Sequence, residues 1–215
     1  MRGGSVVDIV LLIAFLMNYI LNLFFIKKNK YGFLFTKLLL TTLLALFYYF
    51  HNDSTNMVVF IALLFCFFGD LFLEFSQKES CFISGVASFL MGHIFYIICF
   101  VQQASNGLPW WVFLILFLYV AYGFNFYMGL KVEDKRLKAA LGVYSGVILL
   151  MSFSALLRIN SVITSKFVLT FIGSLLFVAS DSVLAHNMFN KKVKHADLWI
   201  MSTYGLAQLL IIMGI

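Results

Sequence analysis

The sequence predicts an all-α membrane protein with eight transmembrane helices in one bundle. Of its 215 residues, 63% are hydrophobic and 11% are charged, and the mean hydropathy is +1.00. Soluble domains carry about 25% charged residues. So apolar a chain cannot be a soluble globule, a disordered tail, a nucleic-acid-binding domain or a secreted disulfide scaffold. We expect a single transmembrane helical domain over residues 1–215.

The apolar stretches divide into eight segments close to the length that crosses the hydrocarbon of a bilayer, about 20 residues. Short polar connections separate them and leave no room for a separate soluble domain. The expected spans are residues 6–26, 33–50, 57–75, 82–101, 110–129, 139–157, 166–186 and 197–215. Any chemistry must therefore take place among the helices.

The first apolar stretch ends at Ile26, is too long for the core of a signal peptide and lacks a small-x-small cleavage site, so it is the first span. Three cysteines, Cys66, Cys81 and Cys99, lie in or beside apolar runs without a CxxC pattern. Neither a disulfide framework nor a zinc site is indicated. We expect no metal and no other cofactor.

The basic residues orient the spans, because short cytoplasmic loops retain Lys and Arg. Twelve of the fifteen fall on the side of the odd-numbered loops: Lys27, Lys28, Lys30, Lys37, Lys78, Lys131, Lys135, Arg136, Lys138, Lys191, Lys192 and Lys194. The opposite side holds Arg2, Arg158 and Lys166. We therefore expect an integral protein of a bacterial inner membrane with both termini outside the cytoplasm.

Two aspartates inside the spans are the first candidates for function, because ionisable groups in a bilayer are costly unless paired or hydrated. Asp70 and Asp181 are each five residues from the cytoplasmic end of an expected span. At about 1.5 Å per residue, both lie roughly 7–8 Å inside that boundary. Glu74 follows Asp70 by one helical turn.

Further polar residues of the spans gather in the same half of the expected bundle. These are Asn18, Asn22, Lys37, Tyr122, Asn125 and Tyr204, with His93 and Gln208 nearer the midplane. The outer halves are almost wholly apolar. This asymmetry predicts a polar pocket that opens toward the cytoplasmic leaflet.

Structural roles compete with functional ones for several of these residues. Glu74 and Lys37 are close enough to helix ends to pair or to extend toward water. His93 fits an interhelical hydrogen bond, and Asn18 and Asn22 fit a helix-joining role. For Asp70 and Asp181 the structural alternative is weaker.

A short internal similarity links the two aspartates. Small-Asp-x-x-Leu occurs at Gly69–Leu73 and at Ser180–Leu184, and His93 and Tyr204 each follow their Asp by 23 residues. The pattern is compatible with a parallel repeat that relates helices 3–4 to helices 7–8.

The blocks GDLFLEF, GVASFLMGHIFYI, FVASDSVLAHNMF and STYGLAQLLI resemble the YhhN/TMEM86 family of integral membrane lysoplasmalogenases. The resemblance implies eight spans and hydrolysis of the vinyl ether bond of lysoplasmalogens to a fatty aldehyde and glycerophosphocholine or glycerophosphoethanolamine. It also implies that Asp70 and Asp181 are catalytic. Where the family commonly has a second Tyr after that of the eighth span, this chain has Gly205.

Vinyl ether hydrolysis fits two carboxyls, one protonated and one ionised, as general acid and base. The residues leave open which aspartate is the acid. The expected partners are a lysophospholipid substrate and membrane lipids, without nucleic acid, and the oligomeric state is undetermined. The alternatives are a proton-coupled transporter of small molecules or lipids that uses the same carboxylates, and a noncatalytic lipid-binding protein.

Overall fold

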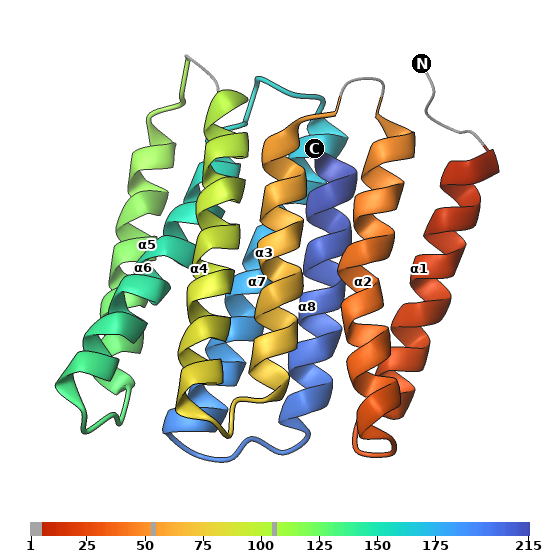
Figure 1. Ribbon diagram of the computed structural model, residues 1–215. Helices are drawn as coiled ribbons and strands as arrows, with labels where there is room; N and C mark the ends of the chain where they lie inside the picture. Colours follow the sequence, from red (N-terminus) through yellow and green to blue (C-terminus); the bar gives the residue numbers. More distant parts are fainter. Residues whose placement is uncertain (1–5, 53–54, 105–106) are drawn as a thin grey trace. The chain divides into compact units, whose positions relative to one another are not determined.

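The computed structural model describes residues 6–52, 55–104 and 107–215, and all regular structure within these ranges is α-helical. The helices are α1 Val6–Phe25, α2 Lys30–His51, α3 Met57–Glu74, α4 Glu79–Gln102, α5 Trp111–Gly129, α6 Lys135–Leu156, α7 Thr164–Phe189 and α8 Ala196–Gly214 (Figure 1). Each is long and apolar enough to cross a membrane. The predicted all-α membrane fold is confirmed.

The observed helices extend beyond the expected spans where polar residues cap them. Asn29 precedes α2, and its side chain accepts a hydrogen bond from the Gly32 amide at 3.0 Å. Asp134 accepts in the same way from the amide of Arg136 at 2.7 Å, so α6 begins at Lys135 rather than at residue 139. Capping stabilises a first turn that hydropathy excludes from the span.

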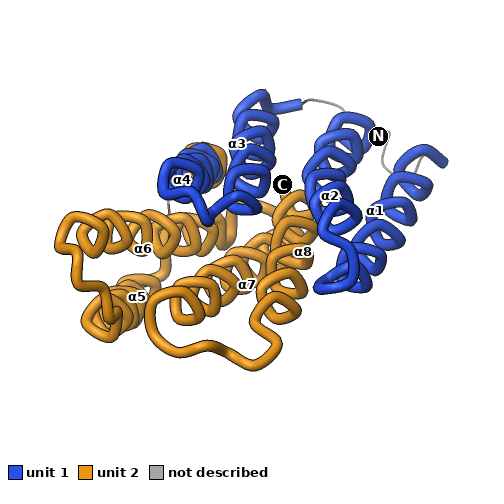
Figure 2. Tube along the Cα trace, turned by 60° about the horizontal axis from the view of Figure 1, so that its bottom comes forward, with its two compact units in different colours: residues 1–96 blue, residues 97–215 orange. Residues whose placement is uncertain are grey.

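The chain divides into two compact units, residues 1–96 and 97–215, and the division falls within α4 (Figure 2). In the first unit, α2 packs against both α1 and α3. In the second unit, α7 packs against α6 and most extensively against α8, and α5 packs against α6. The expectation of a single domain stays a prediction, as does the parallel repeat.

Hydroxyl groups connect three helices of the second unit. The Tyr119 hydroxyl on α5 lies 2.8 Å from Oγ of Ser152 on α6, which lies 2.9 Å from Oγ of Ser174 on α7. Ser152 and Ser174 are fully buried. A buried hydroxyl is costly unless it is hydrogen-bonded, so this chain of contacts fixes the register of the three helices.

Arg158, in the connection between α6 and α7, is a buried charge. It lies in the turn after α6 and is fully buried, with its guanidinium donating to Oγ1 of Thr170 and, at 2.7 Å, to the Gly214 carbonyl oxygen. Burial lowers the pKa of Arg158 to about 10, which leaves it protonated at neutral pH. The cation thus binds the carboxyl end of α8, where the helix dipole is negative. Arg2, counted with it in the charge split, lies outside the described residues.

Gly173 of α7 lies where α7 packs closely on α8, and Gly146 of α6 provides a control. A Cβ at Gly173 would lie 2.9 Å from both the Ala207 oxygen and the Ile211 nitrogen, which are backbone atoms. A Cβ at Gly146 on α6 would meet nothing within 4 Å. Gly173→Ala should lower the melting temperature in detergent, whereas Gly146→Ala should leave it unchanged or raise it, since alanine favours helix by about 1 kcal/mol. Equal effects would contradict this packing.

Candidate active site

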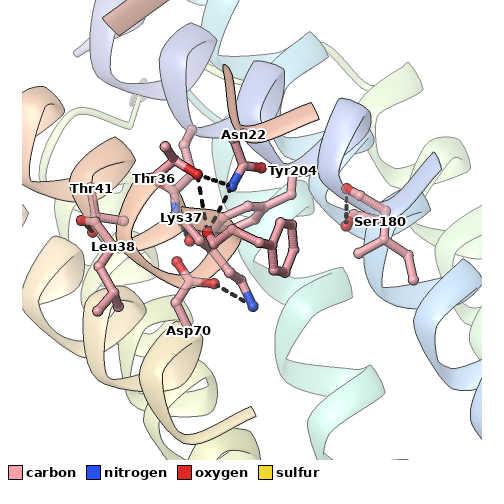
Figure 3. Close-up of polar contacts among 11 residues, drawn as sticks. Asn22, Thr36, Lys37, Leu38, Thr41, Asp70, Ser180 and Tyr204 are labelled. Carbon is pink, nitrogen blue, oxygen red and sulfur yellow. Dashed lines mark hydrogen bonds and ion pairs between the residues drawn. The ribbon is translucent and has the colours of Figure 1, made fainter. Parts of the chain in front are cut away.

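The first unit places Lys37 of α2 against Asp70 of α3. Nζ of Lys37 lies 3.4 Å from Oδ1 of Asp70, and the two side chains are 11% and 2% exposed (Figure 3). Attraction between opposite charges is much stronger in such surroundings than in water. Of the two alternatives for Lys37, extension toward water and pairing, the structure has the pair.

Gly69, the residue before Asp70, allows α4 to approach α3 closely. A Cβ at position 69 would lie 2.5 Å from the ring of Phe89. The Phe89 side chain is buried against this glycine. The small residue of the Gly-Asp pair therefore has a packing role.

Asparagines of α1 bind the adjoining turn of α2. Asn18 donates to the Thr36 carbonyl oxygen at 2.8 Å, and Asn22 donates to Oγ1 of Thr36 at 3.0 Å and to the Phe33 carbonyl oxygen at 3.1 Å. Figure 3 shows Asn22 and Thr36 beside the Lys37–Asp70 pair. Both asparagines therefore have the helix-joining role, and they fix the turn of α2 that carries Lys37.

The amide of Asn22 has a defined orientation. The Phe33 carbonyl oxygen only accepts hydrogen bonds, so the NH2 group of Asn22 must face it. The Oδ1 atom then points away from α2, is buried, and accepts no hydrogen bond from the described residues. A buried amide oxygen in this state is suited to a water or to a hydroxyl of a ligand.

The remaining candidates of the first unit lie on α3 and α4. Glu74 is half-buried in the last turn of α3, and His93 is fully buried on α4. A Cβ at Gly92, next to His93, would lie 3.0 Å from Sγ of Cys66, so α3 and α4 are in close contact at this level.

The second unit places Asp181 of α7 against a tyrosine of α6. The hydroxyl of Tyr144 donates to Oδ2 of Asp181, and both side chains are half-buried. The next residue, Ser182, has its Oγ 2.8 Å from the hydroxyl of Tyr122 on α5. Helices α5, α6 and α7 therefore meet through hydroxyl groups at residues 181–182.

Three other candidates make local contacts. Gln208 on α8 donates to the Tyr204 hydroxyl at 3.4 Å, and both are buried, with the Tyr204 ring edge-on to Phe177. Ser180, the small residue before Asp181, donates to the Ile200 carbonyl oxygen of α8 at 3.1 Å. Asn125 is exposed and donates to the Ala121 carbonyl oxygen of its own helix at 2.7 Å.

The helix ends alter the depth argument from the sequence. Asp70 is four residues from the end of α3 at Glu74, whereas α7 continues to Phe189, eight residues beyond Asp181. Distance from a helix end therefore does not give the two aspartates a common depth. The apolar boundaries from which they were counted remain the only basis for that prediction.

Sequence reasoning missed two contacts with carboxylates. Tyr144 is five residues from the cytoplasmic end of the expected span 139–157, and Asp181 is five residues from the cytoplasmic end of its own span. Comparing the depths of the tyrosines with that of Asp181 would have found it. Asp8, in the first turn of α1, is buried with Oδ2 3.4 Å from Nδ1 of His51 at the end of α2. Asp8 was not among the candidates because it is close to the start of its span, where a charged residue is not unusual.

Each aspartate thus has a different polar partner. Asp70 forms an ion pair with the ammonium group of Lys37, and Asp181 accepts a hydrogen bond from the phenol of Tyr144. Carboxyl groups held by polar partners in this way are the kind of group that acid–base catalysis uses. Within the described ranges, no three His, Cys, Asp or Glu side chains come together as metal ligands.

Comparison with known proteins gives the family. The family model described as the YhhN family matches residues 32–215, which is most of the chain. The chain belongs to the YhhN family. The resemblance seen in the Gly-Asp and Ser-Asp blocks is thereby confirmed.

Relatives of this YhhN protein carry a common name. Lysoplasmalogenase TMEM86A of Bos taurus is 29% identical over 164 residues, 75% of this chain and 65% of that protein. Lysoplasmalogenase TMEM86B of Sus scrofa is 34% identical over 137 residues, 62% and 54% of the two chains. For TMEM86B of Homo sapiens the values are 30% over 132 residues, 61% and 53%. The chain thus matches about half to two thirds of these relatives' length, and no solved structure matches it significantly.

A double-mutant cycle can test the Lys37–Asp70 pair. Lys37→Met or Asp70→Asn leaves one buried charge without its partner and should cost on the order of 3 kcal/mol. The double variant Lys37→Met, Asp70→Asn leaves neither charge in the interior and should therefore melt above both single variants. Melting temperatures in detergent measure this, with exposed Lys78→Met as control. Additive losses would show that the two side chains do not interact.

Proposed function

We propose that this chain hydrolyses the vinyl ether bond of lysoplasmalogens, releasing a fatty aldehyde and glycerophosphocholine or glycerophosphoethanolamine. Support comes from the YhhN match and from relatives named lysoplasmalogenases. The observation that carries the mechanism is the contrast in partners: Asp70 pairs with an ammonium group, and Asp181 accepts from a phenol. We infer that Asp70 is the ionised carboxylate and Asp181 the proton donor.

The reaction requires a proton on carbon before water can add. Asp181 gives its proton to the vinyl carbon β to the ether oxygen, and the π electrons form the new C–H bond. The oxocarbenium ion that results is stabilised by the Asp70 carboxylate, an electrostatic contribution that is large in a low-dielectric site. Water, which loses a proton to Asp70, then adds to the carbon attached to the ether oxygen.

Collapse of the hemiacetal completes the reaction. The C–O bond to glycerol breaks, the glycerol oxygen takes up a proton, and the oxygen from water becomes the aldehyde oxygen. Asp70 gives its proton to the glycerol oxygen, and the hemiacetal hydroxyl gives its proton to Asp181, so the enzyme ends as it began. Lys37 keeps Asp70 oriented and charged between turnovers.

The lipid would enter with its headgroup toward the cytoplasmic side. With the Lys37 ammonium 3.4 Å from Asp70, the exposed lysines of the α1–α2 turn, Lys27 and Lys28, with Lys30 at the start of α2, are better placed to receive the phosphate. The tail would lie along the apolar outer halves of the helices.

Conservative substitutions test the two carboxyls. Asp70→Asn and Asp181→Asn should each lower the rate of aldehyde release from lysoplasmenylethanolamine at least about 100-fold, the usual scale for a general acid or base. Purified protein in detergent is assayed for free aldehyde and soluble headgroup. Exposed Asp197→Asn, in the first turn of α8, is the matched control and should keep its rate. Turnover in either Asn variant near that of the control, or transport of lipid without product, would refute the proposal.

We further propose that both termini lie outside the cytoplasm, on the strength of the twelve-to-three charge split. Lys192→Cys, exposed between α7 and α8, should react with a membrane-impermeant maleimide only from the cytoplasmic side. Ile163→Cys, exposed between α6 and α7, should react only from the opposite side. Both are made with Cys66, Cys81 and Cys99 replaced by Ser. The reverse labelling pattern would contradict this orientation and would show that the polar ends of the helices lie in the other leaflet.

A further inference from the structure

We propose that Tyr144 is the positioning residue of Asp181: its phenol orients the carboxyl for proton transfer and binds more strongly as the carboxylate forms. The inference rests on the proposed hydrolase function and adds to it a residue that the sequence alone did not single out. It begins from the hydrogen bond that the Tyr144 hydroxyl donates to Oδ2 of Asp181.

The geometry of the two side chains determines which one positions the other. A tyrosine side chain has two torsions and a rigid ring, so the hydroxyl is placed by the backbone of α6. An aspartate carboxyl rotates freely unless a partner fixes it. The bond from α6 to α7 therefore selects one orientation of Asp181, in a pair of helices that already pack on each other.

A second tyrosine fixes the neighbouring residue. The Tyr122 hydroxyl of α5 lies 2.8 Å from Oγ of Ser182, and that serine donates to the Val178 carbonyl oxygen of its own helix at 2.6 Å. Residues 181 and 182 are consequently bound to two different helices of the unit. Movement of this turn of α7 would break both contacts, so the carboxyl has a fixed support.

The same bond affects the proton that Asp181 carries. Because Oδ2 accepts from the phenol, it acts as the carbonyl oxygen of the acid form, and the acidic proton resides on Oδ1. When that proton leaves for the vinyl carbon, the carboxyl becomes a carboxylate. Hydrogen bonds to charged acceptors are roughly twice as strong as those to neutral ones. The phenol thus stabilises the transition state more than the ground state, which raises kcat without tightening substrate binding.

Removal of one hydroxyl provides the kinetic test. Tyr144→Phe should lower kcat about 10- to 100-fold and leave KM within about twofold. Tyr119→Phe is the matched control, because it removes a half-buried tyrosine hydroxyl that bonds α5 to α6 at Ser152, away from the carboxyl. Its kcat and KM should stay near wild type. Equal losses of kcat in the two variants would overturn the proposal.

A second measurement separates failure of this inference from failure of the proposed function. The carboxyl band of Asp181 is obtained as the infrared difference between wild type and Asp181→Asn, and it requires no substrate. The band should shift in Tyr144→Phe and stay fixed in Tyr119→Phe. An unshifted band would overturn the Tyr144 inference even if the wild type is active, whereas a wild type that releases no aldehyde would refute the hydrolase function and the positioning role with it.

A combined variant and a milder substitution complete the test. In the Asp181→Asn background, Tyr144→Phe should cause no further loss of residual turnover, because the phenol acts through that carboxyl. Should Tyr144→Phe fail to fold, 3-fluorotyrosine at position 144 keeps the ring and the donor but changes its acidity. The Asp181 band should then shift, and the same label at position 119 should leave it unchanged. A multiplicative loss in the combined variant, or a band insensitive to the label, would contradict the proposed role.

Discussion

A polar side chain buried in a membrane span must find a partner, and this constraint governs every functional contact in the structure. Free polar groups in hydrocarbon cost several kcal/mol, because no water is present to replace a missing hydrogen bond. Lys37 meets the requirement by pairing with Asp70, and Tyr144 meets it by donating to Asp181. The groups that hold the helices together are therefore also those available for chemistry.

This dual use explains why structural and catalytic roles are difficult to separate in such a protein. The Lys37–Asp70 pair joins α2 to α3, and in the proposed reaction it also maintains the carboxylate that stabilises the cationic intermediate. Arg158 shows the purely structural form of the same constraint, since its guanidinium binds Thr170 and the Gly214 carbonyl oxygen at the end of α8. A loss of activity is informative only when melting data accompany it.

The eight helices are predictable from the sequence because hydropathy depends only on the order of residues along the chain. A run of about 20 apolar residues has one stable solution in a bilayer, and the observed bounds differ mainly where caps such as Asn29 and Asp134 extend a helix. The candidate site was predictable in part for the same reason: an aspartate inside an apolar run is conspicuous in any sequence.

Partners were not predictable to the same degree, because they depend on how helices pack. Lys37 could pair or extend toward water, and only packing of α2 on α3 decides between the two. Among ten tyrosines, only its depth in the expected span distinguishes Tyr144, and Arg158 resembles any loop cation until α8 is placed beside it. The small residues before the aspartates look alike in sequence but differ in role: Gly69 admits Phe89, whereas Ser180 donates a hydrogen bond to α8.

If a carboxyl protonates the vinyl carbon, hydrolysis in D2O leaves deuterium at a defined position of the product. Lysoplasmenylethanolamine is hydrolysed by the purified chain in D2O, and the aldehyde is reduced at once and analysed by mass spectrometry, with protein-free substrate as control. We expect one deuterium on the carbon next to the former carbonyl carbon, formed at a rate that Asp181→Asn lowers at least about 100-fold. Aldehyde without deuterium at that carbon would contradict this mechanism.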